Sequence, residues 1–173
     1  IEVKANRPDM LSHMGIAREI KAFDGQKIPR VEKSDIKINN DKFPLNINVD
    51  PKCCKRFCAI ELKNVDCSVK TPEYITKRLH ALGINSVNSV VDIGNYIMID
   101  MGQPVHCYDE DKLSGSLHVN FADQDKEITT FSGETAKIKA GDIIISDDND
   151  IKCIAGVIGS DSAAVTEKSK NII

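Results

Sequence analysis

The stretch VVDIGNYIMIDMGQPVHCYDEDKL, residues Val90–Leu113, combines an apolar run, a Gly-Gln-Pro break, a histidine and an acidic cluster. Its apolar residues recur with a helical rather than a two-residue period, which predicts a helix over Ser89–Met101. Gly102 and Pro104 are expected to end that helix. His106 then follows on a loop carried by a helix, a setting in which binding groups are often held.

A glycine stands inside this predicted helix, at position 94. Glycine in a helix interior costs about 1 kcal/mol relative to alanine, so something other than helix propensity favours Gly94. Close approach of a backbone or of a ligand is one explanation, and an altered pocket shape is another. The sequence alone leaves the choice open.

Upstream of this stretch, a single amphipathic helix is predicted near the N-terminus. Asp9 or Ser12 can cap its start, and Asp24-Gly25 can end it. Its apolar positions, three or four residues apart, are Leu11, Met14, Ala17 and Ile20. Because one helix cannot bury such a stripe alone, we expect residues 1–25 either to pack on the following domain or to belong to a neighbouring domain, in which case they would pack sparsely here.

The next segment is expected to be a linker over residues 26–44, since Gln26–Asp41 is polar, charged and interrupted by Pro29. Alternation of apolar and polar residues over Leu45–Asp50 then predicts a strand with one wet face. A second strand is expected at Arg56–Lys63.

A further helix is predicted after Thr71-Pro72-Glu73, which offers an N-cap, a proline at the first helical position and an acidic first turn. Ile75, Leu79 and Leu82 would line one face of this helix. Gly83 would end it.

The second half of the chain favours strands. Residues 117–122 alternate in polarity, and short apolar runs follow at Ile128–Phe131, Ile143–Ser146 and Ile151–Ala155. Helices gathered in the middle of a mostly strand-forming chain predict an α+β fold, with helices packed against mixed or antiparallel sheets. We expect residues 45–173 to form this domain.

Two glycines, Gly156 and Gly159, come just after the last predicted strand. Glycine at such positions permits either a tight turn or the close approach of a ligand to the backbone. A turn is the plain interpretation.

Composition narrows the class of protein. With 173 residues and 41% apolar content, the chain can bury one good core. It lacks an apolar run of about 20 residues and a signal-peptide pattern, which predicts a soluble, cytoplasmic protein without membrane contact. Six scattered cysteines are read as reduced thiols, and no metal site is expected, because Cys53, Cys54 and Cys58 lack a second ligand cluster. The net charge of −3 makes any nucleic-acid contact local.

Three motifs identify a family. Val90–Leu113 is similar to V-V-D-x-x-N-Y-x-M-x-x-x-G-Q-P-x-H-x-x-D-x-x-K-L of the bacterial phenylalanyl-tRNA synthetase beta chain. Asn6–Phe23 resembles its N-R-P-D-x-L-S-x-x-G-I-A-R-E, and Ala155–Val165 resembles its A-G-x-x-G-G-x-x-S-x-V. The family's beta chain is several times longer, so the resemblance implies a fragment. Residues 1–25 would be a helical remnant of the preceding first domain, and the rest would hold nearly all of the editing and tRNA-contacting block.

The resemblance implies a function in protein biosynthesis. In the family, this block hydrolyses tyrosine wrongly attached to tRNA(Phe), because a synthetic pocket shaped for phenylalanine discriminates only partly against an added hydroxyl. The matching catalytic positions here are His106 and Asn95. The matching pocket positions are Gly94, Gln103, Pro104, Ala155, Gly156, Val157 and Gly159. Asn85 and Arg78 would contact tRNA.

Departures from the family pattern suggest a second, non-catalytic interpretation: a structural and RNA-contacting module with weakened editing. The family often has arginine where this chain has Asn85, and usually threonine where it has Gly94. A glutamate that reads the tyrosine hydroxyl is expected in the family just past Ile173. The resemblance also implies tRNA(Phe) and a synthetase alpha subunit in a heterotetramer as partners. No cofactor is expected for this part, since ATP and Mg²⁺ belong to the full synthetase.

Overall fold

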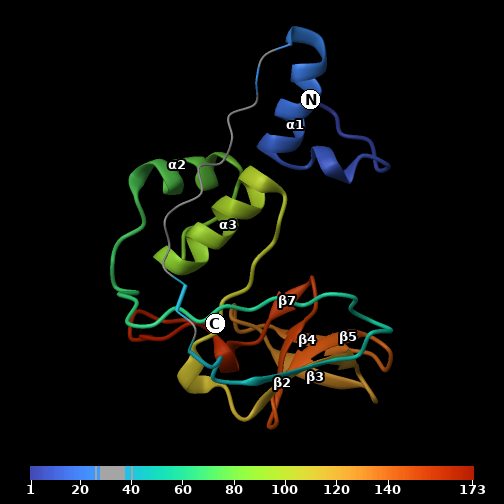
Figure 1. Ribbon diagram of the computed structural model, residues 1–173, viewed down its shortest axis with the longest axis vertical. Coiled ribbons are helices and arrows are strands. Elements are labelled where there is room, and N and C mark those ends of the chain that lie inside the picture. The colour runs from blue at the N-terminus through green and yellow to red at the C-terminus, as the bar shows by residue number, and fades with distance from the viewer. Residues whose placement is uncertain (26, 28–37, 40) are drawn as a thin grey trace. The chain divides into compact units, whose positions relative to one another are not determined.

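The computed structural model describes residues 1–25, 27, 38–39 and 41–173, and these fall into two compact units (Figure 1). The helical unit comprises residues 1–41, 71–87 and 91–105, and the sheet unit comprises residues 42–70, 88–90 and 106–173. Most of the expected linker, 26–44, lies outside the described residues. These two units are defined by contacts within the chain and do not test the expected domain boundaries, so the division into residues 1–25, 26–44 and 45–173 stays a prediction.

The helical unit begins with α1, His13–Asp24, whose predicted ends are confirmed. The Ser12 hydroxyl accepts a hydrogen bond from the Gly15 amide at 2.9 Å, and Gly25 ends the helix in the left-handed conformation. Leu11 is 67% exposed and Ile20 is 52% exposed. Met14 and Ala17 are half-buried, so the apolar stripe is packed only in part. The assignment of Leu11 to the helix was wrong, because Leu11 precedes the N-cap Ser12.

The second helix, α2, spans Glu73–Ala81 and ends as predicted. Gly83, with a positive φ, donates to the carbonyl of His80, and Ile84 donates to that of Leu79, which is a Schellman motif. Ile75 and Leu79 are buried as expected. Leu82 is not, because it is the C-cap residue and lies 52% exposed past the last turn.

The predicted N-cap of α2 is wrong for a specific reason. Pro72 occupies the N-cap, and the Thr71 hydroxyl instead donates to Asp92 on α3, Ser89–Met101. Asp92 is fully buried and also accepts from the Ser86 hydroxyl and, at 2.9 Å, from the Val87 amide. One carboxylate thus ties both ends of the α2 segment to α3.

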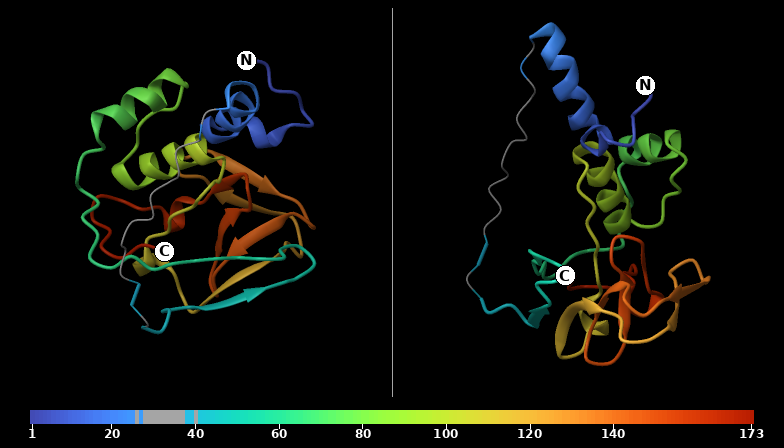
Figure 2. Two further views of the ribbon diagram at one scale, coloured as in Figure 1. Left: turned by 45° about the horizontal axis from the view of Figure 1, so that its top comes forward. Right: turned by 90° about the vertical axis from the view of Figure 1, so that its right-hand side faces the viewer.

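The sheet unit contains a five-stranded sheet in the order β1-β2-β5-β6-β7, with β1 parallel to β2 and the other pairs antiparallel. These strands are β1 Asn46–Val49, β2 Ser116–Phe121, β5 Ile143–Ser146, β6 Ile151–Ile154 and β7 Ile158–Gly159. A separate hairpin pairs β3, Lys126–Thr129, with β4, Thr135–Ile138 (Figure 2). The predicted α+β class with mixed sheets is confirmed.

The core covers both faces of the sheet's central strands. Ile144 on β5 belongs to one apolar cluster with Ala122, Ile138, Ile151 and Ile154. Ile145, its neighbour, points to the other face and packs with Tyr108, Cys153 and Ala163. This second cluster matters for the site, since it anchors the residues that follow His106.

Two strand predictions need correction. Arg56–Lys63 is not a strand: it makes one bridge, where Leu62 exchanges backbone hydrogen bonds with Ile172 at 2.8 and 3.0 Å. A local pattern does not ensure a partner along the whole length of a strand. The reverse error occurs at β4, which the sequence analysis missed although exposed Thr135 and Lys137 alternate with the more buried Ala136 and Ile138; four residues are a short signal.

Candidate functional site

His106 lies against the backbone of Gly159 in the sheet unit. A Cβ atom built on Gly159 would come 2.4 Å from Cε1 and 2.8 Å from Nε2 of the His106 ring. The φ of Gly159 is not in the left-handed region, so space for the imidazole, and not backbone conformation, requires glycine here. The sequence placed these two residues in one site, and the structure brings them into contact.

Tyr108 supports the other side of the imidazole. Its ring centroid lies 4.5 Å from that of His106, with an angle of 66° between the planes. Tyr108 is 3% exposed, and its backbone exchanges hydrogen bonds of 2.7 and 3.0 Å with Ile173. The sequence analysis missed Tyr108, although in an extended chain a residue two positions after His106 shares its side.

The surroundings of His106 favour its neutral form. His106 is exposed to solvent, but desolvation by the protein atoms that pack against its ring lowers its pKa below the usual value. Burial raises the pKa of Tyr108, so that phenol stays protonated. A neutral imidazole has one nitrogen that donates and one that accepts, which is what holding and deprotonating a water molecule requires.

The neighbouring Cys107 is poorly suited to nucleophilic attack. Burial, with a smaller contribution from the Cys67 thiol, raises the pKa of Cys107. Both cysteines pack in an apolar cluster with Val165 and Ile172. Since the thiolate is the reactive form, the raised pKa disfavours nucleophilic attack by the Cys107 sulfur.

The remaining glycine-rich positions have plainer roles. Gly156 has a φ of 72° in the turn between β6 and β7, which the Val157 amide closes by donating to the Ile154 carbonyl at 2.9 Å. The plain interpretation of Gly156 as a turn residue is therefore confirmed. Ala155 is half-buried and Val157 is 76% exposed.

The other predicted residues belong to the helical unit. Asn95 is half-buried on α3, and Gln103 and Pro104 are exposed after it. A Cβ on Gly94 would lie 3.3 Å from Cγ2 of Val105, a tight contact that explains part of the preference for glycine. Their roles in substrate binding stay predictions. The predicted tRNA contacts, Asn85 and Arg78, are both exposed.

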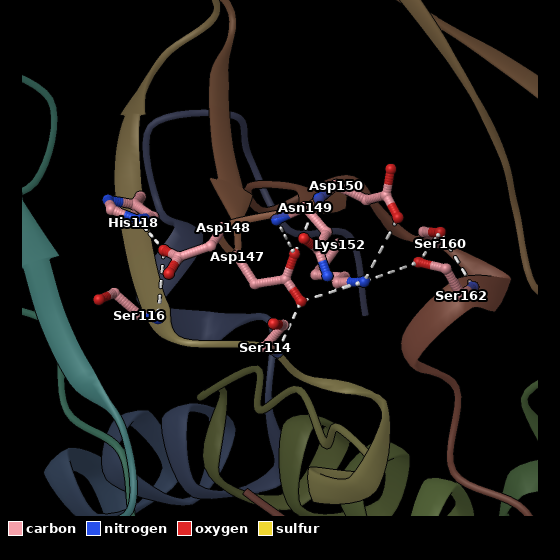
Figure 3. Close-up of polar contacts among 10 residues, drawn as sticks. All are labelled: Ser114, Ser116, His118, Asp147, Asp148, Asn149, Asp150, Lys152, Ser160 and Ser162. Carbon is pink, nitrogen blue, oxygen red and sulfur yellow. Dashed lines mark hydrogen bonds and ion pairs between the residues drawn. The ribbon is translucent and has the colours of Figure 1, made fainter.

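A buried polar cluster on the sheet unit was not expected from the sequence (Figure 3). Lys152 on β6 is 3% exposed and pairs with Asp147 at 3.2 Å. Asp147 also accepts from the amides of Ser114, Asn149 and Asp150 at 2.8–2.9 Å. Burial alone would raise the pKa of Asp147, but these hydrogen bonds and Lys152 outweigh it, and the pKa is lowered. The cluster holds the β5–β6 turn in shape.

Two open cavities of about 320 and 310 Å³ flank that turn on the sheet unit. Their lining includes Asn149, Asp150 and Ile151, and it does not include His106. Among the residues that the structure describes, no three His, Cys, Asp or Glu side chains are grouped to hold a metal ion. Nor is any described helix long and apolar enough to cross a membrane.

Residues 53–173 match the B3/4 domain family. The chain belongs to that family. It is also similar to curated proteins, being 38% identical over 175 residues to the phenylalanine–tRNA ligase beta subunit of Fusobacterium nucleatum subsp. nucleatum, with 99% of this chain and 22% of that protein covered. The phenylalanine–tRNA ligase beta subunit of Neisseria meningitidis serogroup B is 35% identical over 174 residues, which cover 100% of this chain and 22% of that protein. The B3/4 chain thus spans about a fifth of the length of these relatives.

A solved structure shares the fold of this B3/4 chain. It is an N-terminal fragment of the phenylalanyl-tRNA synthetase beta-subunit from Pyrococcus horikoshii, with a TM-score of 0.50 and 18% identity. The similarity covers 96% of this chain and 51% of that one. At 18% identity, the similarity supports the α+β fold and nothing further.

Proposed function

We propose that this chain is part of a phenylalanine–tRNA ligase beta subunit and hydrolyses tyrosine mischarged on tRNA(Phe). The observation that carries the proposal is the His106 imidazole, which packs on the Gly159 backbone and against the Tyr108 ring. The lowered pKa of His106 agrees with a role as a base. The subunit assignment is supported by identity of 38% and 35% over nearly the whole chain to proteins of that name.

In the proposed reaction, His106 orients a water molecule and accepts its proton. The water oxygen bonds to the ester carbonyl carbon, the bond between that carbon and the ribose oxygen breaks, and the ribose oxygen leaves with a proton. Tyrosine and uncharged tRNA are released. Asn95 is proposed, from the motif match alone, to bind the substrate, and the raised pKa of Cys107 supports a route without a covalent intermediate.

The partners and cofactors are part of the same proposal. We propose tRNA(Phe) and a synthetase alpha subunit as partners, because the similar proteins are beta subunits of a tRNA ligase. No cofactor is proposed for this chain, since water and an imidazole suffice for ester hydrolysis.

The test is release of tyrosine from tyrosyl-tRNA(Phe) by this chain under single-turnover conditions. General base catalysis contributes roughly 10²–10⁴-fold, so His106→Ala should lose most of the acceleration over buffer. Cys107→Ser, which changes the adjacent side chain, should keep it. Equal rates for wild type and His106→Ala, or no acceleration by wild type, would reject the proposal.

The second candidate is a non-catalytic RNA-contacting module. It is favoured by Gly94 and Asn85, which stand where the family usually has threonine and often has arginine. Binding of tRNA(Phe) without hydrolysis of its tyrosyl ester would support this candidate over the first.

A further inference from the structure

Two tyrosines and an arginine join α2 to α3 in the helical unit: exposed Tyr74 and Arg78 and half-buried Tyr96. The two tyrosine rings are perpendicular, with centroids 6.1 Å apart. The Arg78 guanidinium carbon lies 6.0 Å from the centroid of Tyr74 and 5.7 Å from that of Tyr96, and Arg78 donates a hydrogen bond to the Tyr96 hydroxyl. We call these three residues the tyrosine–arginine platform.

The platform does more than hold the helices together. Buried Ile75 and Leu79 and the hydrogen bonds to Asp92 already provide contacts of α2 and its flanking residues. Tyr74 remains 58% exposed, so more than half of its surface is open to solvent. In a chain with three tyrosines and no tryptophan, two tyrosines meet here. An exposed, ordered aromatic ring beside a guanidinium is chemically suited to a planar, anionic ligand.

We propose that the tyrosine–arginine platform binds an unpaired nucleotide of tRNA. The base stacks on Tyr74, and the guanidinium of Arg78, held in place by the Tyr96 hydroxyl, contacts the phosphate. Lys77, one residue away, is paired with Glu73 at 2.8 Å, so Arg78 is the cation that the platform offers to a phosphate. In a chain of net charge −3, contact with RNA depends on such a local positive charge.

The identity of the RNA as tRNA rests on the proposed function, but the binding mode does not depend on hydrolysis. RNA is favoured over a protein partner because the platform combines a cation, Arg78, that can contact a phosphate with aromatic rings on which any base can stack. A protein partner that used the same surface would leave tRNA affinity unchanged when the platform is altered.

The experiment measures the affinity of this chain for uncharged tRNA(Phe) by fluorescence anisotropy at fixed salt. Removing one base-stacking ring by Tyr74→Leu should weaken binding about 5- to 100-fold. Tyr74→Phe keeps the ring and should stay within about twofold of wild type. Phe131→Leu is the matched control, because Phe131 is an aromatic residue of equal exposure, 59%, on the sheet unit.

A second variant tests the phosphate contact. Arg78→Gln should weaken binding and reduce the slope of log affinity against log salt concentration by about one. The inference is overturned if Tyr74→Leu binds tRNA as wild type does, or if Phe131→Leu weakens binding equally. Thermal unfolding of each variant shows whether a loss reflects misfolding. Binding that depends on Tyr74 in a chain that hydrolyses nothing would uphold this inference and reject the editing proposal.

Discussion

Replacing Gly159 with alanine should displace the His106 ring. The added methyl carbon would lie 2.4 Å from Cε1, whereas carbon atoms at ordinary contact are about 3.5–4.0 Å apart, so the ring must move by roughly 1 Å or more. The backbone of Gly159 imposes no strain on alanine, and His106 is open to solvent on one side. Stability should therefore fall by only about 1 kcal/mol, the low end for overpacking.

Activity should fall much further than stability. A displacement of about 1 Å in a catalytic group costs on the order of 10²-fold in rate. The assays are tyrosyl-tRNA(Phe) deacylation and the NMR signal of the His106 Cε1 proton, whose titration should move up toward the usual histidine pKa as the ring leaves its desolvated seat.

Gly156→Ala is the control for this prediction. Nothing lies within 4 Å of a Cβ at Gly156, but its φ of 72° disfavours alanine, which should cost about 1–2 kcal/mol of stability. It should leave the His106 signal where it is. If Gly159→Ala keeps both the His106 titration and the deacylation rate of wild type, the packing argument for the site is wrong.

Three further predictions concern the helical unit and the pH dependence of stability. Asp92→Ala should lower the free energy of unfolding in urea by about 2–4 kcal/mol, because three donors lose hydrogen bonds to a fully buried carboxylate. A loss below about 1 kcal/mol would show that Asp92 does not anchor α2. Burial alone would raise the pKa of Asp92, but its hydrogen bonds lower it, as they do for Asp147. Both carboxyls therefore stabilise the fold fully above about pH 4, and this contribution should be lost as the pH falls through their lowered folded-state pKa. The urea midpoint of Asp92→Asn should consequently fall less steeply with decreasing pH than that of wild type. Gly94→Ala should raise the free energy of unfolding by less than about 1 kcal/mol, because the added methyl group contacts Val105. The increase should be larger in a Val105→Ala background, and an equal increase in both backgrounds would show that this contact does not matter.

Local signals in the sequence were sufficient for the helices. Ser12 caps α1 because a short hydroxyl side chain at that position can reach a free amide, and Gly83 ends α2 because it adopts a positive φ. Thr71 carried the same kind of signal as Ser12, and that prediction was wrong, because a buried carboxylate from α3, distant in sequence, attracts its hydroxyl.

The strands and the buried polar groups depended on partners that no local pattern reveals. Leu62 pairs with Ile172, which lies more than a hundred residues later, and only over one bridge. Lys152 interrupts an apolar run and would be expected at the surface, yet it is buried because the Asp147 carboxylate and its turn surround it.

The candidate site was predictable in part. The motif resemblance pointed to His106 and to the 155–159 segment, and the contact between His106 and Gly159 agrees with it. The sequence could not distinguish the turn residue Gly156 from the space-making Gly159, since the difference lies in φ and in a neighbour far away in the chain. Its spacing of two residues from His106 was a signal for Tyr108, but the burial of Tyr108 follows from the packing of Cys153 and Ala163 around it, which the sequence does not reveal.

The central claim is that a neutral His106 activates water for hydrolysis of a tyrosyl ester. Its most direct test is the rate of tyrosine release from tyrosyl-tRNA(Phe), followed from about pH 5 to about pH 8 in wild type and His106→Ala. We predict that the wild-type rate above buffer falls with a midpoint below the usual histidine pKa of about 6.5, and that His106→Ala lacks this step. A midpoint at or above 6.5, or the same profile in both proteins, would contradict the account.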